Sequence, residues 1–324
     1  MFLFVARRLA WACVLAFVIS LVTFILFFLI PNDAATLRVG RGSLARSLQT
    51  QFDLQGSPPQ QYAQFLEHIF TADFGRSTRT REDASRLVGK ALPVTASLVI
   101  GGALFWMLIA IPIGVLSALR PRSLLDRGAM TFVLIGISAH PVWIGLIFAW
   151  LFGFYAHEHG SPIYFPISNY ADFFNPPPGQ PGGPVQWAYH LVLPWTTFMI
   201  LFAALYVRMI RANVMETLNE DYVRTARAKG APESVVLRSH VLRNAMLPVV
   251  TMLGMDIGLA LGGAIFTESV YGLPGLGRTA VQALFNYDTP TIMGVIVFAT
   301  IVIIVFNLIV DLLYAVIDPR IRLA

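Results

Sequence analysis

Six apolar runs, each long enough to cross a lipid bilayer, constrain the fold of this chain more than any other feature. A helix needs about 20 mostly apolar residues to cross the hydrocarbon core, and only helices and closed barrels satisfy the backbone polar groups inside lipid. The runs lie at about 9–30, 91–119, 128–155, 189–207, 245–266 and 291–317. We therefore predict an all-α integral membrane protein with six transmembrane helices.

Composition leads to the same class. Of the 324 residues, 56% are hydrophobic and only 13% are charged, which is more apolar than one soluble core can accommodate. The first run is too long for a signal-peptide core and no small-residue cleavage site follows it, so we expect an uncleaved anchor. Four prolines lie in or at the ends of later runs, and we expect kinks there: Pro112, Pro141, Pro194 and Pro248.

Arginine and lysine residues predict the orientation, because short cytoplasmic loops carry an excess of them. Basic residues precede the first run and also lie between the second and third and between the fourth and fifth, whereas 156–188 has none. The 31–90 segment carries eight basic residues but is long enough for this rule to lose force. We predict a multi-pass protein of the cytoplasmic (inner) membrane with both termini on the cytoplasmic side.

The runs divide the chain into three expected parts. The first is an N-terminal transmembrane helix over 1–30, and the second is an extracytoplasmic loop region over 31–90 with a helical patch around 61–70. The third is a core domain over 91–324 with five transmembrane helices. Within this core, a basic cytoplasmic loop spans about 208–244.

The local signals in that loop predict two short helices. Asn219 can cap a helix whose first turn carries Glu220 and Asp221, and Gly230 can end it. Pro232 can then open the next helix. We expect the chain to bend at Gly230.

The side chains of the first short helix suit contact with another protein. Ala226 and Ala228 are small enough to allow close approach, and three basic residues can pair with an acidic groove: Arg224, Arg227 and Lys229. The alternative is an ordinary basic loop that only fixes the membrane topology.

The fifth run contains a glycine repeat and a lone acid. Gly254, Gly258 and Gly262 recur every four residues, so they lie along one helix face and suit close helix packing. Asp256 points away from that face. An ionisable residue inside a span is costly and usually meets a partner or a wet cavity. We take Asp256 as a candidate lining residue of a translocation path; the alternative is a hydrogen bond to a neighbouring helix.

Several activities are excluded or disfavoured. No nucleotide-binding loop G-x-x-x-x-G-K-[ST] occurs, so the chain cannot supply its own ATP hydrolysis. The single cysteine, Cys13, forms no internal disulfide, and His157–His159 lacks the spacer of a metalloprotease motif. We expect no catalytic residue, no metal site, no bound cofactor and no nucleic-acid partner.

Several separate blocks, in order along nearly the whole chain, resemble the B-type transmembrane subunit of dipeptide and oligopeptide importers of the ATP-binding cassette (ABC) class. The main blocks are ADFGRS (72–77), LPVTASL (92–98), DYVRTARAKG (221–230), HVLRNAMLPVVT (240–251), ESVYGLPGLGR (268–278) and DLLYAVIDPRIR (311–322). ABC importers more broadly carry Glu-Ala-Ala where this chain has Arg224, Thr225 and Ala226, and this departure favours the peptide branch over the sugar branch.

This resemblance implies the type I ABC importer fold and a set of partners. They are a homologous second permease subunit, two ATPase subunits that bind ATP and magnesium, an extracytoplasmic substrate-binding protein and membrane lipid. It also implies a helix that couples ATPase closure to alternating access, formed here by Asp221, Tyr222, Arg224, Thr225, Ala226, Arg227, Ala228, Lys229 and Gly230.

The substrate stays open at this point. Related subunits serve importers of nickel, glutathione or oligosaccharides as well as di- and oligopeptides. A secondary transporter is a more distant alternative, because few acidic residues lie within the runs and no inverted repeat is visible.

Overall fold

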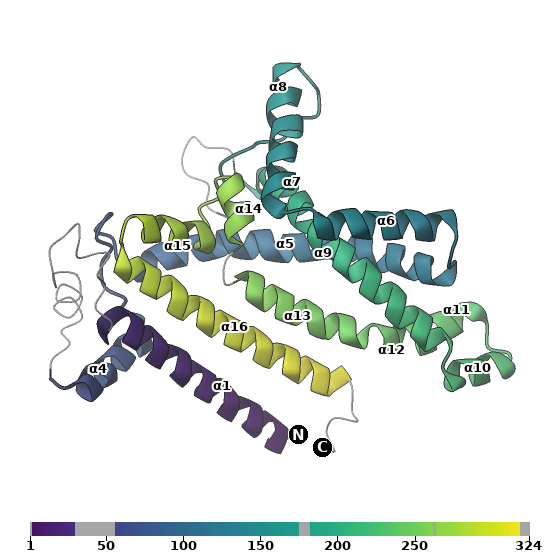
Figure 1. Cartoon of the computed structure of the whole chain (residues 1–324), viewed down its shortest axis with the longest axis horizontal. Coiled ribbons are helices and arrows are strands. Elements are labelled where there is room, and N and C mark those ends of the chain that lie inside the picture. The colour runs from purple at the N-terminus through teal and green to yellow at the C-terminus, as the bar shows by residue number, and fades with distance from the viewer. Residues whose placement is uncertain (1, 30–55, 175–181, 262–263, 318–324) are drawn as a thin grey trace. The chain divides into compact units, whose positions relative to one another are not determined.

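The computed structural model describes residues 2–29, 56–174, 182–261 and 264–317. Within these ranges the chain forms helices and no strand, apart from one isolated bridge between Arg76 and Asp83 (Figure 1). The all-α prediction is confirmed.

Four helical segments are each long and apolar enough to cross a membrane. They are α1 (Phe2–Phe24) with η1 (Ile25–Leu29), α5 (Ala84–Leu119), α9 (Pro184–Leu218) and α16 (Thr289–Ile317). Two bent pairs qualify if each pair is taken as one span, and these bring the number to six: Leu124–Ser138 with Pro141–Glu158, and Glu233–Ala245 with Leu247–Leu261.

The third predicted span is broken rather than kinked. Its two halves, α6 (Leu124–Ser138) and the helix that begins with α7 (Pro141–Phe148) and continues through η2 (Ala149–Tyr155) into α8 (Ala156–Glu158), meet at 103°. Pro141 cannot donate a backbone hydrogen bond, and His140 Nδ1 instead accepts one from Val142 N at 3.3 Å, which caps α7. Pro112 and Pro194 lie inside α5 and α9, which continue through them.

The described chain separates into two compact units. The first unit comprises Met1–Thr95, Gly258–Ile265 and Pro274–Leu308, and the second comprises Ala96–Ile257, Phe266–Leu273 and Ile309–Ala324. The first unit also contains α4 (Pro58–Phe70) and α15 (Leu276–Phe285), whereas α14 (Ile265–Val270) begins in the first unit and continues in the second.

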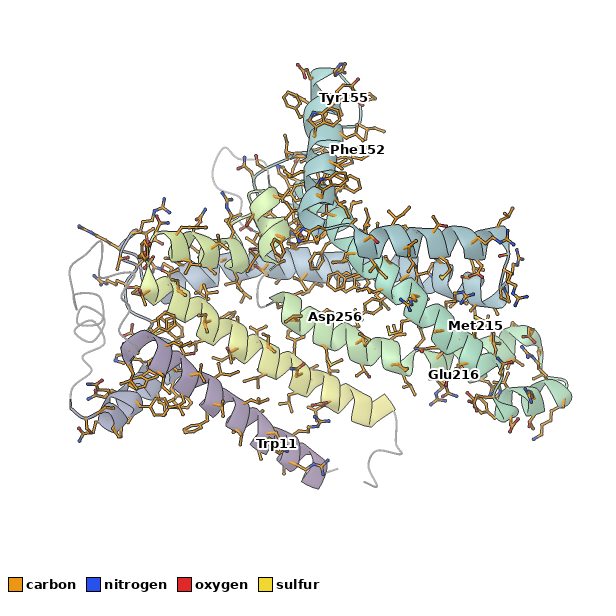
Figure 2. The ribbon with its side chains drawn as sticks, viewed as in Figure 1. Trp11, Phe152, Tyr155, Met215, Glu216 and Asp256 are labelled. Carbon is orange, nitrogen blue, oxygen red and sulfur yellow. The ribbon has the colours of Figure 1, made fainter. Side chains whose placement is uncertain are left out.

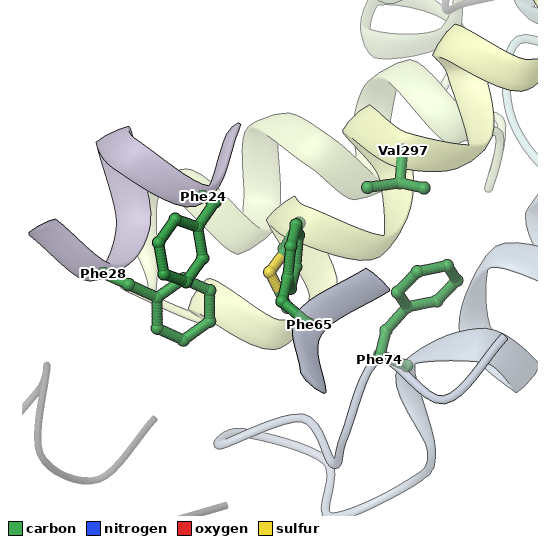
Figure 3. Close-up of a cluster of buried hydrophobic side chains, with 7 residues drawn as sticks. Phe24, Phe28, Phe65, Phe74 and Val297 are labelled. Carbon is green, nitrogen blue, oxygen red and sulfur yellow. The ribbon is translucent and has the colours of Figure 1, made fainter. Parts of the chain in front are cut away.

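Aromatic side chains hold the first unit together. Phe65 of α4 is fully buried, with its ring centroid 5.7 Å from that of Phe24 and 5.5 Å from that of Phe28. The other members of the cluster are Phe74, Ala84, and Met293 and Val297 of α16 (Figure 3). The helical patch predicted around 61–70 is therefore confirmed as α4, which buries its apolar side against α1 and α16.

Close helix packing organises the second unit around α9. A Cβ atom added to Gly114 of α5 would lie 2.8 Å from Ile210, and one added to Gly136 of α6 would lie 2.7 Å from Ala204. Trp106 stacks on Phe202 with 4.5 Å between ring centroids. Helix α9 therefore contacts both α5 and α6 through positions that only glycine can occupy without a shift.

Candidate functional site: the α10 hairpin and its supports

Helix α9 continues well beyond the apolar run that predicted it and ends at Leu218. The prediction that Asn219 caps the next helix is wrong. Asn219 is the C-cap of α9, its backbone N–H donates to Glu216 O at 3.0 Å, and its side chain donates to Met215 O at 2.9 Å. Because these groups serve α9, Glu220 with its extended backbone becomes the N-cap of α10 (Asp221–Ala228).

Gly230 ends α10 as predicted. Its φ of +79° is left-handed, its N–H donates to Arg227 O at 2.9 Å, and the Ala231 N–H donates to Ala226 O at 3.2 Å. This pair of bonds satisfies the last carbonyls of the helix. The next helix, α11 (Glu233–Val235), begins directly after Pro232, also as predicted, and runs on through η3 (Val236–Leu242) and α12 (Arg243–Ala245).

Three interactions hold α10 in place. Val223 is fully buried, the Asn244 side chain of α12 donates to Tyr222 Oη at 2.8 Å, and Arg227 binds the Glu233 carboxylate through two hydrogen bonds of 2.6 and 3.2 Å. The bond to Glu233 raises the pKa of the Arg227 guanidinium, which therefore remains charged. We call the segment from α10 to α12 the α10 hairpin.

The outer surface of the hairpin is open to solvent. Figure 2 shows it beyond Met215 and Glu216, at the end of α9. Arg227 is engaged by Glu233 within the hairpin, and exposed Arg224 lies 3.7 Å from Asp221. The other exposed positions among the predicted contact residues are Tyr222, Thr225, Ala228, Lys229 and Gly230, whereas Ala226 is half-buried.

An ion pair that the sequence did not reveal lies farther back along α9, between a buried carboxylate and a half-buried guanidinium. Arg211 Nε and Nη2 donate to the two oxygens of Asp126 on α6, at 2.6 and 3.0 Å. Asp126 is only 4% exposed, and it also accepts hydrogen bonds from Ser117 Oγ of α5 and from Arg122 N at 2.8 Å. The pattern of Ser123 followed three residues later by an acid could have placed Asp126 in a first helical turn, but nothing local identifies its partner.

Asp256 of α13 (Leu247–Leu261) accepts a 2.7 Å hydrogen bond from Tyr206 Oη of α9 (Figure 2). Asp256 is half-buried, whereas Tyr206 is 1% exposed. This contact matches the alternative of a bond to a neighbouring helix. A role for Asp256 in lining a translocation path stays a prediction.

Two residues of the glycine repeat face α16. A Cβ atom added to Gly258 would lie 3.2 Å from Phe306 Cβ, and one added to Gly254 would collide with Val310. Gly262, the third member of the predicted repeat, lies outside the described residues.

A second buried carboxylate that the sequence did not reveal holds the ADFGRS block (72–77) of the first unit in place. Asp288, 4% exposed at the start of α16, accepts hydrogen bonds from Ser77 Oγ at 2.5 Å, Thr78 N at 3.0 Å and Thr291 Oγ1 at 2.8 Å. Phe74 of the same block packs on Gly294, where an added Cβ atom would lie 3.3 Å from the ring. The block is therefore a loop held to the first turns of α16.

Comparison with known proteins identifies the kind of protein to which these features belong. Residues 110–323 match the family model described as binding-protein-dependent transport system inner membrane component. Residues 1–99 match the model of the N-terminal part of such membrane components.

Several named relatives match over nearly their full length. The chain is 34% identical to the dipeptide transport system permease protein DppB of Escherichia coli (strain K12) over an alignment of 335 positions, covering 98% of each chain. It is 32% identical to a putative peptide transport system permease protein of Brucella abortus (strain 2308), again over 98% of each chain. It is 31% identical to the probable peptide ABC transporter permease protein y4tP of Sinorhizobium fredii, over 98% of this chain and 99% of the relative.

Full-length matches of this kind agree with the all-α fold and with four candidate spans, or six when each bent pair is taken as one span. The chain belongs to the family of binding-protein-dependent transport system inner membrane components, the multi-pass translocation subunits of ABC importers.

Proposed function

We propose that this chain is one of two homologous transmembrane subunits of an ATP-driven importer that moves di- or oligopeptides across the cytoplasmic membrane. The names of its relatives support the peptide class. The observation that carries the coupling role is the α10 hairpin. Its exposed surface is basic, and α10 is fixed to the rest of the loop by buried Val223 and by the hydrogen bonds of Tyr222 and Arg227.

The mechanism follows from how the hairpin is attached. Two ATPase subunits bind ATP and magnesium, and each docks on the hairpin of one transmembrane subunit. Closure of the ATPases pushes on α10, and α9 passes the displacement into the span because the two helices are separated only by Asn219 and Glu220. The two subunits then move between outward-open and inward-open states. ATPase closure shifts the equilibrium between these two states, as in other allosteric proteins.

The remaining partners follow from the same proposal. An extracytoplasmic binding protein delivers the substrate, and this chain itself binds no cofactor or metal. Both termini and the α10 hairpin face the cytoplasm, because the basic residues gather in the hairpin and in the turn between α5 and α6.

Reconstitution tests the proposal. The chain is co-purified with its second transmembrane subunit and ATPases, placed in proteoliposomes, and supplied with the binding protein and a radiolabelled dipeptide. We expect uptake that requires ATP, is stopped by vanadate and is lost when the ATPases are omitted.

Other outcomes separate the alternatives. Uptake driven by a proton gradient without ATPases identifies a secondary transporter and refutes the proposal. ATP-dependent uptake of nickel, glutathione or an oligosaccharide, without dipeptide uptake, retains the importer mechanism and refutes the peptide substrate.

A further inference from the structure

The ion pair between Asp126 and Arg211 joins three helices at one point. Both carboxylate oxygens of Asp126 receive a guanidinium nitrogen of Arg211 on α9, at 2.6 and 3.0 Å. One oxygen also receives the Ser117 hydroxyl of α5, and the other receives the Arg122 backbone N–H at 2.8 Å. A forked pair of this kind fixes the angle between its two partners as well as their distance.

The same three helices are in close contact elsewhere. Gly114 of α5 faces Ile210 of α9, and Gly136 of α6 faces Ala204 of α9, each with no room for a Cβ atom. Helices α6 and α9 also pack on each other. The glycine contacts alone would let α9 slide or rotate against its neighbours, because smooth apolar surfaces have no directional bonds, whereas the forked ion pair prevents both movements.

The position of the pair along α9 matters for transmission. Arg211 lies seven positions before Leu218, the last residue of α9, with unbroken helix between them, which is about 10 Å at 1.5 Å per residue. Any displacement of α10 therefore reaches Arg211 before it reaches the glycine contact at Ala204.

We infer that Asp126 and Arg211 are positioning residues for coupling: their ion pair makes α5 and α6 move together with α9 when α10 is displaced. This inference rests on the proposed function. Without the pair, α9 would rotate or slide against α6, and ATP would be hydrolysed with less substrate moved per cycle.

The first test replaces both charges at once. The Asp126→Leu/Arg211→Met double variant removes the pair without leaving a buried unpaired charge, a type of replacement that proteins often tolerate. We expect hydrolysis stimulated by the binding protein to continue while substrate moved per ATP falls about fivefold or more. Arg211→Lys keeps the charge but cannot form the two-pronged bond, so its ratio of substrate to ATP should fall by less. Arg208→Gln changes an exposed neighbour on α9 and should keep the wild-type ratio.

The second test measures the movement itself. Spin labels at exposed Thr131 of α6 and Ala212 of α9, in a Cys13→Ser background, report the distance between the two helices. We expect the same distance in the nucleotide-free and vanadate-trapped states of the otherwise wild-type complex, and a state-dependent distance in the double variant.

Two results would overturn the inference: a double variant with the wild-type ratio of substrate to ATP, or an inter-helix distance that changes between states with the pair intact. If the double variant does not accumulate, Arg211→Lys decides, and a wild-type ratio in that variant overturns the inference. Failure of the proposed function would appear differently, as absence of ATP-dependent uptake in the wild type itself.

Discussion

Tyr206 of α9 donates a 2.7 Å hydrogen bond to Asp256 of α13, and thereby gives the acidic residue of the fifth predicted span a partner on a neighbouring helix. A carboxylate in a membrane span is costly unless it has a partner or meets water. Asp256 is only half-buried, so the bond to Tyr206 leaves part of the carboxylate accessible. The contact is thus compatible with both a packing role and a role in the translocation path.

Two substitutions distinguish these roles. Tyr206→Phe removes the donor and should destabilise the chain by about 1.5–3 kcal/mol, the range for hydrogen bonds to charged groups, measured by thermal unfolding in detergent. If Asp256 lines the path, Asp256→Asn should change the KM for uptake of peptides that have a free amino group. The melting temperature of the Asp256→Asn chain should be similar to that of the Tyr206→Phe chain, or higher. Met255→Leu, at the exposed neighbouring position, is the control. An Asp256→Asn chain with unchanged uptake would limit Asp256 to packing.

Gly258→Leu should disturb the chain's own fold. A Cβ atom at this position would already lie 3.2 Å from Phe306 of α16, and overpacking of this kind costs about 1–3 kcal/mol. We expect a lower melting temperature for the isolated subunit. Gly128→Leu is the matched control, because a Cβ atom there meets no atom within 4 Å. A normal melting temperature combined with failure to assemble would instead place the repeat at the interface with the second subunit.

Gly230→Pro should separate membrane assembly from ATPase docking. The φ of +79° at Gly230 lies far from the value near −65° that proline requires, and proline also lacks the N–H that Gly230 donates to Arg227 O. An added Cβ atom meets no described atom within 4 Å, so the effect comes from the backbone and not from a side-chain clash. We expect normal pairing of the transmembrane subunits but loss of co-purifying ATPase and of stimulated hydrolysis. Gly230→Asn, which tolerates the left-handed region, should retain most of both. A Gly230→Pro complex with its ATPases bound and full hydrolysis would refute the docking assignment.

Asp288→Ala should loosen the ADFGRS loop. The substitution removes the acceptor of Ser77, Thr78 and Thr291 in a buried setting, and one lost bond to a charged group already costs about 1.5–3 kcal/mol. We expect faster protease cleavage within 72–83 and a lower melting temperature. Asn286→Ala is the control, because that exposed side chain caps α15 by donating to Gln282 O and does not touch the loop's hydrogen bonds to Asp288. Equal cleavage rates in the two variants would show that Asp288 does not hold the loop.

Cysteine labelling tests the proposed orientation. In a Cys13→Ser background, cysteines at exposed Glu67 and Glu158 should react with an impermeant maleimide from outside intact cells. Cysteines at exposed Pro121 and Ser234 should react only after the membrane is opened. Labelling of Ser234→Cys from outside would invert the topology and exclude ATPase docking on the α10 hairpin.

Local properties of the sequence were enough to predict the class of the protein and several element ends. Apolar length predicted the spans, because the bilayer requires about 20 apolar residues per helix regardless of what surrounds it. The end of α10 at Gly230 and the start of α11 after Pro232 were predictable, because each depends on the backbone angles of one residue.

Only the tertiary structure decided which polar side chains meet and where the longest helices end. Arg211 binds Asp126, 85 residues away in the sequence, and Tyr206 bonds to Asp256, 50 residues away. These pairings depend on which helices become neighbours. Helix α9 runs on to Leu218 and uses Asn219 as its C-cap, so a good capping residue served the helix before it instead of the one after it. The apolar length of each segment determines whether it can span the membrane. The partner of each buried charge is determined by helix packing, which no local pattern encodes.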